Sequence, residues 1–366
     1  MTILLRPIWF VDSPVGLPDG TWRRLANTLL WFQGVEVRRA GLPVEHVPVA
    51  GLDAWLDGLP ADLRLRADTQ LAGLAAYRPS MTLGERTIRF DVPQVMGILN
   101  MTPDSFSDGG RHLGAGANWA DAAADAGFAM GLAGATIIDV GGESTRPGAD
   151  PVWEGDEIAR VVPVIERLAK SGTVISIDTR KAAVMEAALA AGAHIVNDIS
   201  GLLHDPRAME VVAAAGCPVV LMHSPSAGQN PHEKTLPYGD VVAETYAFLE
   251  GRITACVAAG IARERIMVDP GIGFGKSLSD SLALVNRLAT FQALGLPLLL
   301  GASRKRIVGA LSNEALPAER LGGSLTLALE GVRAGAAVLR VHDVPESAQA
   351  VRVWRGLRDA ALSAVG

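Results

Sequence analysis

The feature that most constrains this chain is a short unit that recurs eight times after about residue 94. Each unit begins with a run rich in Val, Ile and Leu that ends in polar residues, continues through a Gly/Pro loop and closes with an Ala-rich stretch. The apolar runs do not alternate with polar residues, which is typical of parallel strands covered on both faces. The eight runs are Val95–Thr102, Thr136–Gly142, Val174–Thr179, His194–Ser200, Pro218–Ser224, Ile266–Gly273, Pro297–Arg304 and Val338–Val344.

The segments between these runs have the composition and periodicity of helices. Several of them end in Gly, the usual residue at a left-handed helix C-cap. Eight such units within about 265 residues predict a TIM-type (β/α)8 barrel. An open, doubly wound sheet is the alternative, and eight regular units without a break argue against it. The clearest helical segments are Trp119–Ala133, Glu157–Lys170, Lys181–Ala191, Asp240–Ala259 and Gly322–Ala334.

The N-terminal residues do not share this rhythm. They contain short strand-like runs, Val35–Arg38 and Thr87–Val92, separated by Pro/Gly turns. We therefore expect a small α+β appendage over residues 1–90 and the barrel over residues 91–366. Nothing in the sequence indicates what the appendage does.

Composition excludes several classes of function. The chain has 366 residues, of which 49% are hydrophobic and 20% charged, so a large core is expected and disorder is not. The net charge of −6 gives no basic face for nucleic acid. The apolar runs are far shorter than the roughly 18 residues of a membrane span. Two cysteines do not make a disulfide framework, which favours a reducing, cytoplasmic location.

Polar or ionisable side chains lie near the C-terminal end of every run. A carboxylate buried among Val and Ile without a partner would cost several kcal/mol. Eight such positions in register are best explained by one polar opening, here called the barrel mouth, where barrels of this type carry their active sites. The residues are Asn100, Asp139 with Glu143, Asp178, Asn197 with Asp198, His223, Asp269, Ser303 with Lys305, and Arg340 with His342.

The strand-end residues also divide by charge. Asp178, Asn197 and Asp269 offer acceptors and an amide, which suits a flat heterocycle with adjacent N–H donors. Strands seven and eight contribute cations instead, and those strands commonly form a phosphate site in such barrels. The sequence thus predicts a ligand with a polar ring at one side and a phosphate or diphosphate at the other, bound by Lys305, Arg340 and His342.

Asn100, on the first strand, is adjacent to the eighth strand when the barrel closes. It could complete the ligand shell of a Mg²⁺–diphosphate, since Mg²⁺ keeps most of its waters and takes few protein ligands. Two polar, turn-rich loops, Thr102–Gly110 and Gly141–Gly148, follow strands and could close over the site. Ordinary surface loops are the alternative for both.

Seven segments, read together and in order, resemble dihydropteroate synthase. The first, second and fifth are long and specific. They are Met96–Gly110 (MGILNMTPDSFSDGG), Ile138–Gly148 (IDVGGESTRPG), Ser176–Thr179 (SIDT), Val196–Ile199 (VNDI), Asp269–Lys276 (DPGIGFGK), Ser303–Lys305 (SRK) and Arg340–Asp343 (RVHD).

The resemblance implies an enzyme of folate biosynthesis that joins 6-hydroxymethyl-7,8-dihydropterin diphosphate to 4-aminobenzoate. It also implies Mg²⁺ as cofactor, a homodimer and sensitivity to sulfonamides. The implied site residues are Asn100, Lys305, Arg340 and His342 for catalysis, with Asn100 at the metal; Thr145, Asp178, Asn197, Asp269, Lys305, Arg340 and His342 for the pterin diphosphate; and Thr145, Arg146, Pro147, Phe274 and Ser303 for the aminobenzoate.

Two rivals remain at this point. A non-catalytic paralogue would retain the barrel, but it should have lost members of the polar set. A pterin-dependent methyltransferase could share the Asp and Asn contacts, but it needs neither the two loops nor an Arg-x-His pair. The chain also departs from the family pattern at Met222–Ser226 and at Arg306, which leaves the loop after the fifth strand uncertain.

Overall fold

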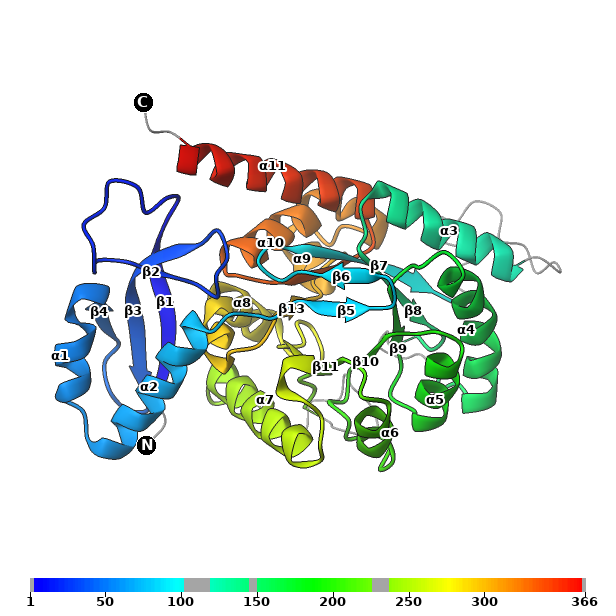
Figure 1. The fold of residues 1–366 in the computed structure, drawn as a ribbon, viewed down its shortest axis with the longest axis horizontal. Coiled ribbons are helices and arrows are strands. Elements are labelled where there is room, and N and C mark those ends of the chain that lie inside the picture. The colour runs from blue at the N-terminus through cyan, green and yellow to red at the C-terminus, as the bar shows by residue number, and fades with distance from the viewer. Residues whose placement is uncertain (1–2, 102–118, 145–149, 226–236, 364–366) are drawn as a thin grey trace.

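The computed structural model describes residues 3–101, 119–144, 150–225 and 237–363. Its centre is an eight-stranded parallel sheet in the order β12-β11-β10-β9-β8-β7-β14-β13. A bridge between Val268 and Leu298 joins the two ends of that order, so the sheet closes into a barrel (Figure 1). The predicted (β/α)8 barrel is confirmed. Its strands are β7 (Gln94–Asn100), β8 (Ile137–Gly141), β9 (Ile175–Asp178), β10 (Ile195–Asp198), β11 (Val219–Met222), β12 (Ile266–Asp269), β13 (Leu299–Leu300) and β14 (Val338–Val341).

Helices surround the barrel on the outside (Figure 1). The five helices expected from the sequence are α3, α4, α5, α7 and α10, and their ends agree within three residues. Most barrel strands are buried along their whole length, which explains why they read as continuous apolar runs. The helices are α3 (Trp119–Ala133), α4 (Glu154–Ala169), α5 (Ala182–Ala190), α6 (Ala208–Ala215), α7 (Val241–Ala258), α8 (Leu278–Asn286), α9 (Arg306–Leu311), α10 (Leu321–Arg333) and α11 (Val344–Ser363).

A hairpin covers the end of the barrel opposite the mouth. It consists of β5 (Met81–Leu83) and β6 (Arg86–Ile88), joined by a tight turn in which Gly84 has a φ of +59°. Its apolar side chains form one buried cluster with residues of the barrel strands, so this end is filled by side chains. The cluster contains Met81, Leu83, Ile88, Phe90, Met96, Ile137, Val174, Ile195, Val220, Met267, Leu299, Ala337 and Val338.

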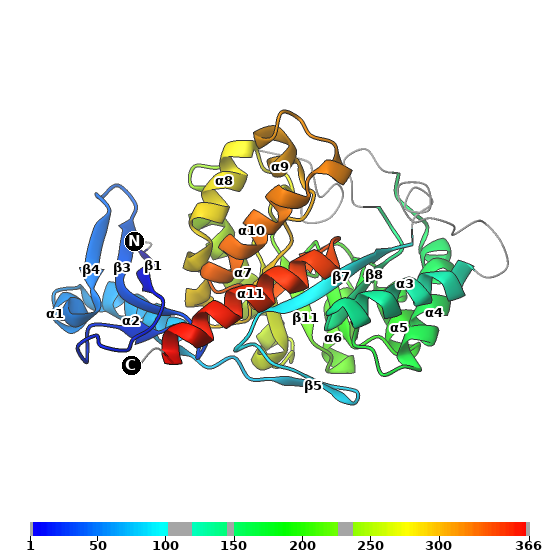
Figure 2. The ribbon, with the colours of Figure 1, turned by 90° about the horizontal axis from the view of Figure 1, so that it is seen from above.

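The N-terminal residues form a separate antiparallel sheet beside the barrel (Figure 2). The side chain of Gln70 accepts from the backbone N–H of Leu5 and donates to the carbonyl of Ile3, both at 2.8 Å, so it pairs with the free edge of β1. This N-terminal layer contains both strands and helices, as predicted for an α+β appendage. Its elements are β1 (Ile3–Val11), β2 (Arg23–Arg24), β3 (Trp31–Arg39), β4 (Glu45–Pro48), the 3₁₀ turn η1 (Val49–Gly51), α1 (Leu52–Asp57) and α2 (Ala61–Ala75).

This layer is attached to the barrel through η4 (Leu288–Leu294), a buried 3₁₀ segment after α8. The guanidinium of Arg78 donates to the carbonyls of Gly73 and Gln292, one on each side of the junction. Arg6 donates to the carbonyl of Asn286 at 3.0 Å. The appendage therefore packs against the flank of the barrel.

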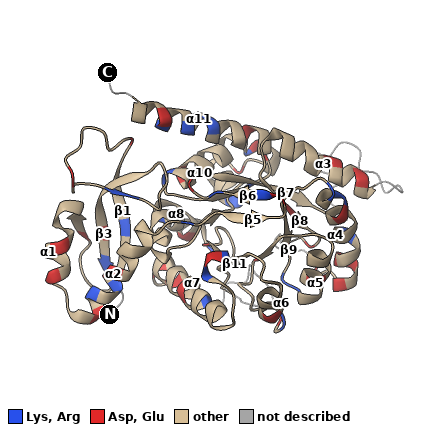
Figure 3. Cartoon of the chain, in the orientation of Figure 1, with Lys and Arg blue, Asp and Glu red and all other residues tan. Residues whose placement is uncertain are grey.

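Cys217 and Cys256 are both buried and not joined by a disulfide. Acidic and basic residues are interspersed over the helices in the view of Figure 3. Within the described ranges, no helix combines the length and the apolar character needed to cross a bilayer.

Candidate active site

The closed barrel brings the strand-end residues to one mouth. Neighbouring strands are in parallel register there, with Asn100 paired to Gly141, Gly141 to Asp178 and Asp178 to Asn197. A Cβ built on Gly141 would lie 3.5 Å from Asn100 Oδ1 and 3.7 Å from Asp178 Oδ2. The side chains of Asn100 and Asp178 therefore flank the same small residue.

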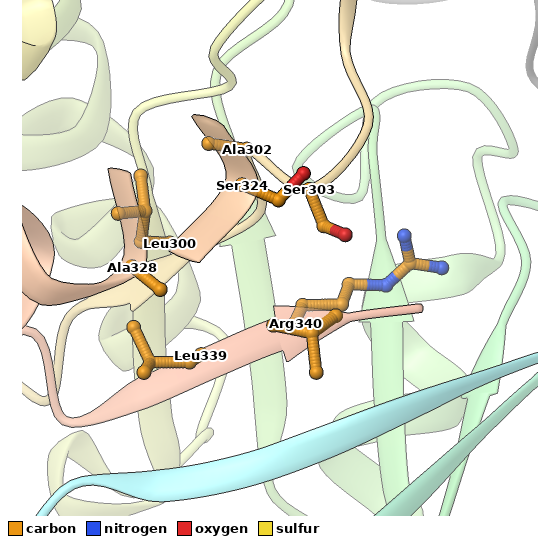
Figure 4. A pocket seen from close by; sticks show the side chains of 8 residues that line it. Leu300, Ala302, Ser303, Ser324, Ala328, Leu339 and Arg340 are labelled. Atoms are coloured by element: carbon orange, nitrogen blue, oxygen red, sulfur yellow. The ribbon is translucent and has the colours of Figure 1, made fainter. Parts of the chain in front are cut away.

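Arg340 joins two acids across the barrel interior. Its Nε donates to Asp139 Oδ2 and its Nη2 to Asp178 Oδ2, both at 2.6 Å. Figure 4 shows the guanidinium pointing away from the apolar side chains of Leu300 and Leu339. Two charge-assisted bonds to separate carboxylates fix both the position and the plane of the guanidinium.

Asp139 is the centre of this group, although the sequence did not single it out as a binding residue. It is 0% exposed, and its Oδ2 also accepts from Asn197 Nδ2 at 3.1 Å. Because Nδ2 of Asn197 donates to Asp139, the side-chain Oδ1 is the atom of Asn197 that can accept a hydrogen bond from a ligand. The signal was present in the pattern, since Asp139 interrupts an otherwise apolar strand, but its partners lie far along the chain.

The charges in this group are strongly coupled. Burial raises the pKa of Asp178 to about 7; Arg340 opposes this effect and the nearby Asp139 adds to it. Burial alone would lower the pKa of Arg340, but the two carboxylates outweigh it and raise that pKa. The guanidinium is therefore permanently charged, whereas Asp178 can exchange a proton near neutral pH.

A second group lies between β12 and β13. Lys305 Nζ donates to the carbonyl of Ile272 at 2.7 Å and lies 4.4 Å from the centre of the Phe274 ring. Burial lowers the pKa of Lys305 to about 8, and Asp269 partly opposes that shift. Burial raises the pKa of Asp269 despite the nearby Lys305. An amine with so low a pKa is poised to gain from an acceptor that a ligand brings.

Ser303 and His342 form a third contact at the mouth. His342 Nδ1 and Ser303 Oγ are hydrogen-bonded at 3.1 Å, and the His342 backbone N–H donates to the same oxygen at 3.2 Å. A small cavity between β13, β14 and α10 has a volume of about 10 Å³ and is lined by residues such as Ser303, Ser324 and Arg340 (Figure 4). That volume holds one water at most, so this cavity is no substrate site.

Known proteins resemble this chain over the barrel. The family model described as "Pterin binding enzyme" matches residues 96–342. The dihydropteroate synthase of Escherichia coli (strain K12) is 48% identical over 262 residues, which cover 71% of this chain and 90% of that protein. A dihydropteroate synthase of Bacillus subtilis (strain 168) is 44% identical over 260 residues, 71% of this chain and 86% of the relative.

Solved structures agree. The dihydropteroate synthase of Xanthomonas albilineans with 4-aminobenzoic acid has a TM-score of 0.71 and 43% identity, and the match covers 79% of this chain and all of that one. The Yersinia pestis enzyme with a sulfonamide drug complex also has a TM-score of 0.71, with 44% identity over 77% of this chain and all of the other. The chain belongs to the dihydropteroate synthase family.

Some of the residues expected for a dihydropteroate synthase have other neighbours in the structure than the sequence suggested. The sequence placed Arg340 on a phosphate-binding side, apart from the acids. The structure places its guanidinium between Asp139 and Asp178, while Lys305 lies beside Asp269. The acids and the cations of the mouth therefore form mixed pairs, and the phosphate-binding role of Arg340 stays a prediction.

Part of the expected site lies outside the described residues. Thr145, Arg146 and Pro147 fall in the undescribed stretch 145–149, and the whole loop Thr102–Gly110 falls in the undescribed stretch 102–118. The base of the second loop is described: Glu143 accepts from the N–H of Val152, and Lys181 Nζ donates to Glu143 and to the carbonyl of Val152. The two ends of that loop are therefore held together.

The described residues of the mouth offer few protein ligands for a metal ion. Within the described ranges, no group of three or more His, Cys, Asp or Glu side chains could hold a metal ion. A Mg²⁺ that is bound mainly by diphosphate and water needs only one or two protein oxygens. Asn100, with its Oδ1 near Gly141, fits such a minor role.

The free energy of unfolding should depend on pH through Asp178. Between about pH 4 and 7 the folded state holds more protons on this carboxyl than the unfolded chain, so stability should fall as the pH rises through that window. Asp178→Asn has no such proton to lose and should give a flatter profile. Urea unfolding at pH 5–8 measures this, with the exposed Asp53→Asn as control. Equal slopes for Asp178→Asn and the unmodified protein would contradict the raised pKa.

Proposed function

We propose that this chain joins 6-hydroxymethyl-7,8-dihydropterin diphosphate to 4-aminobenzoate, giving 7,8-dihydropteroate and diphosphate. The observation that carries the proposal is the group of Arg340, Asp139, Asp178 and Asn197, which holds polar atoms of four strands in one mouth. Structures of relatives support the choice of substrates: the Xanthomonas albilineans enzyme has been solved in complex with 7,8-dihydropteroate and with 4-aminobenzoic acid.

The ring of the pterin would be bound by the acids and amides. Asp178 and Asp269 offer carboxylate oxygens to ring N–H groups, and Asn197 offers its carbonyl oxygen. Lys305 would donate to a ring acceptor, as it now donates to the carbonyl of Ile272. Because these groups are already held by protein partners, little ordering is required when the ring binds.

We infer a dissociative reaction. The bond between the pterin methylene carbon and the diphosphate oxygen breaks first, and the bonding electrons leave with diphosphate. The resulting cation is stabilised by Asp178 and Asp269. The arylamine nitrogen then attacks the methylene carbon and releases one proton. The amine is neutral at pH 7, so no strong base is needed.

Departure of the diphosphate needs positive charge at the mouth. Arg340 and His342 are the residues proposed for this, with His342 oriented by Ser303. Arg340 would contribute as a member of the group with Asp139 and Asp178 rather than as a free cation. Asn100 would hold a Mg²⁺, which would further neutralise the charge of the diphosphate.

The aminobenzoate would lie near Phe274 and Ser303, together with Thr145, Arg146 and Pro147. Phe274 is buried beside Lys305, and Ser303 is buried beside His342, so both lie at the edge of the ring site. The homodimer, the cytoplasmic location and the division at residue 90 stay predictions.

Purified protein tests the proposal directly. It should release diphosphate only when both the pterin diphosphate and 4-aminobenzoate are present, and the product should have the mass of dihydropteroate. Calorimetric titration should show tight aminobenzoate binding only after the pterin diphosphate or diphosphate is bound. Diphosphate release without the arylamine, or none at all, would reject the proposal in favour of a hydrolase or a non-catalytic paralogue.

A further inference from the structure

Lys276 lies at the mouth but has no role in the reaction proposed above. It directly follows the glycine-rich turn 271–275, which comes after β12, and it is half-buried. Its ammonium donates to three carbonyls, those of Gly271 at 2.9 Å, Phe274 at 3.2 Å and His223 at 3.3 Å. An ammonium has three donors, so this set of backbone acceptors engages all of them.

The turn that Lys276 holds has little stiffness of its own. Gly271, Gly273 and Gly275 all have positive φ values, of +68°, +82° and +56°, which glycine alone adopts at little cost. A Cβ built on Gly271 would come within 2.1 Å of the His223 carbonyl oxygen, so the turn packs directly against the backbone after β11. The same lysine bridges these two backbone segments.

The turn in its present form positions groups on both sides of the proposed site. The N–H of Gly271 donates to Asp269 Oδ1 at 2.7 Å. Phe274 presents its ring to Lys305, whose ammonium also donates to the carbonyl of Ile272. A shift of the turn would therefore move the ring and the lysine together.

Several titratable groups surround Lys276 and affect its protonation. Burial lowers the pKa of Lys276 to about 7; Asp269 and Asp280 oppose this shift, and Lys305 adds to it. His223 lies across the turn, and burial together with Lys276 lowers its pKa to about 2, so its imidazole is neutral. With a pKa of about 7, Lys276 is partly protonated near neutral pH, and the carbonyls of Gly271, Phe274 and His223 lie within hydrogen-bonding distance of its Nζ.

We propose that Lys276 is a positioning residue for the condensation: it holds the turn 271–275 so that Phe274 and Lys305 meet the two substrates in the right places. The inference rests on the proposed function. Lys276 is not proposed to contact substrate. The proposed role differs from a purely structural one because loss of the Lys276 side chain should change substrate binding by correctly folded enzyme.

Steady-state kinetics of Lys276→Met test this inference. The KM for 4-aminobenzoate should rise about tenfold, since small misplacements of binding groups have effects of this order. Lys170→Met, the same change at an exposed lysine, should leave the KM unchanged. The midpoint of thermal unfolding is measured in parallel. A lower midpoint with an unchanged KM would overturn the inference in favour of a structural role.

A double-mutant cycle gives a second, independent outcome. If Lys276 acts through Phe274, then Lys276→Met together with Phe274→Leu should raise the KM little more than Phe274→Leu alone. Effects that multiply would overturn the inference. Should Lys276→Met fail to fold, Lys276→Gln, which keeps two N–H donors, takes its place in the same cycle. Inactive wild-type protein would count against the proposed function, whereas active wild-type with normal kinetics for the variants would reject only this inference.

Discussion

Replacing Arg340 with Met is expected to lower kcat/KM by about 10³-fold and the free energy of unfolding by about 3–5 kcal/mol. Both losses have the same origin. The guanidinium is the shared partner of Asp139, which is 0% exposed, and of Asp178, and its removal leaves two carboxylates facing each other in the core. Removing one member of a buried ion group is costly because the remaining charge is uncompensated.

Urea unfolding and steady-state kinetics of the same preparation measure the two losses. Arg306→Met is the matched control: Arg306 is highly exposed, and its only ion pair among the described residues, with Glu314, is long at 3.8 Å. It should change stability by less than about 1 kcal/mol. His342→Ala should impair turnover with a much smaller loss of stability. If Arg340→Met and His342→Ala both kept normal turnover, the leaving-group role of these residues would be lost.

Replacing Lys305 with Met is expected to separate activity from stability. The dissociation constant for the pterin diphosphate should rise about 100-fold, because a buried charged donor to the ring is lost. Stability should change little or even increase. Burial disfavours the ammonium, as its pKa of about 8 indicates, and Asp269 compensates only part of that cost.

Calorimetric titration gives the affinity, and thermal unfolding gives the midpoint. Lys170→Met again controls for the loss of a lysine. A Lys305→Met protein with normal affinity would exclude Lys305 from the pterin site. A midpoint several degrees lower would show instead that the ammonium contributes more to the fold than burial costs, and the separation from Arg340→Met would disappear.

The main fold could be predicted because its signal is local. Each barrel strand is an apolar run between turn residues, and each turn and helix has its own composition. The eight units could therefore be recognised separately in the sequence. β13 was found in the same way even though only Leu299 and Leu300 form regular strand pairs. The N-terminal sheet was less legible. β1 pairs with β3 across about 30 residues, and its free edge is completed by Gln70, which no local pattern indicates.

The sequence by itself determined which residues reach the mouth, because parallel strands of one barrel end at the same face. Only the tertiary structure decided how their side chains pair. Arg340 is 162 residues from Asp178 and 201 from Asp139, and a long, flexible side chain can point to many partners. Its rotamer is set by the buried carboxylates that need a counter-charge, just as Lys276 is directed by two carbonyls of the glycine-rich turn and by the carbonyl of His223 after β11.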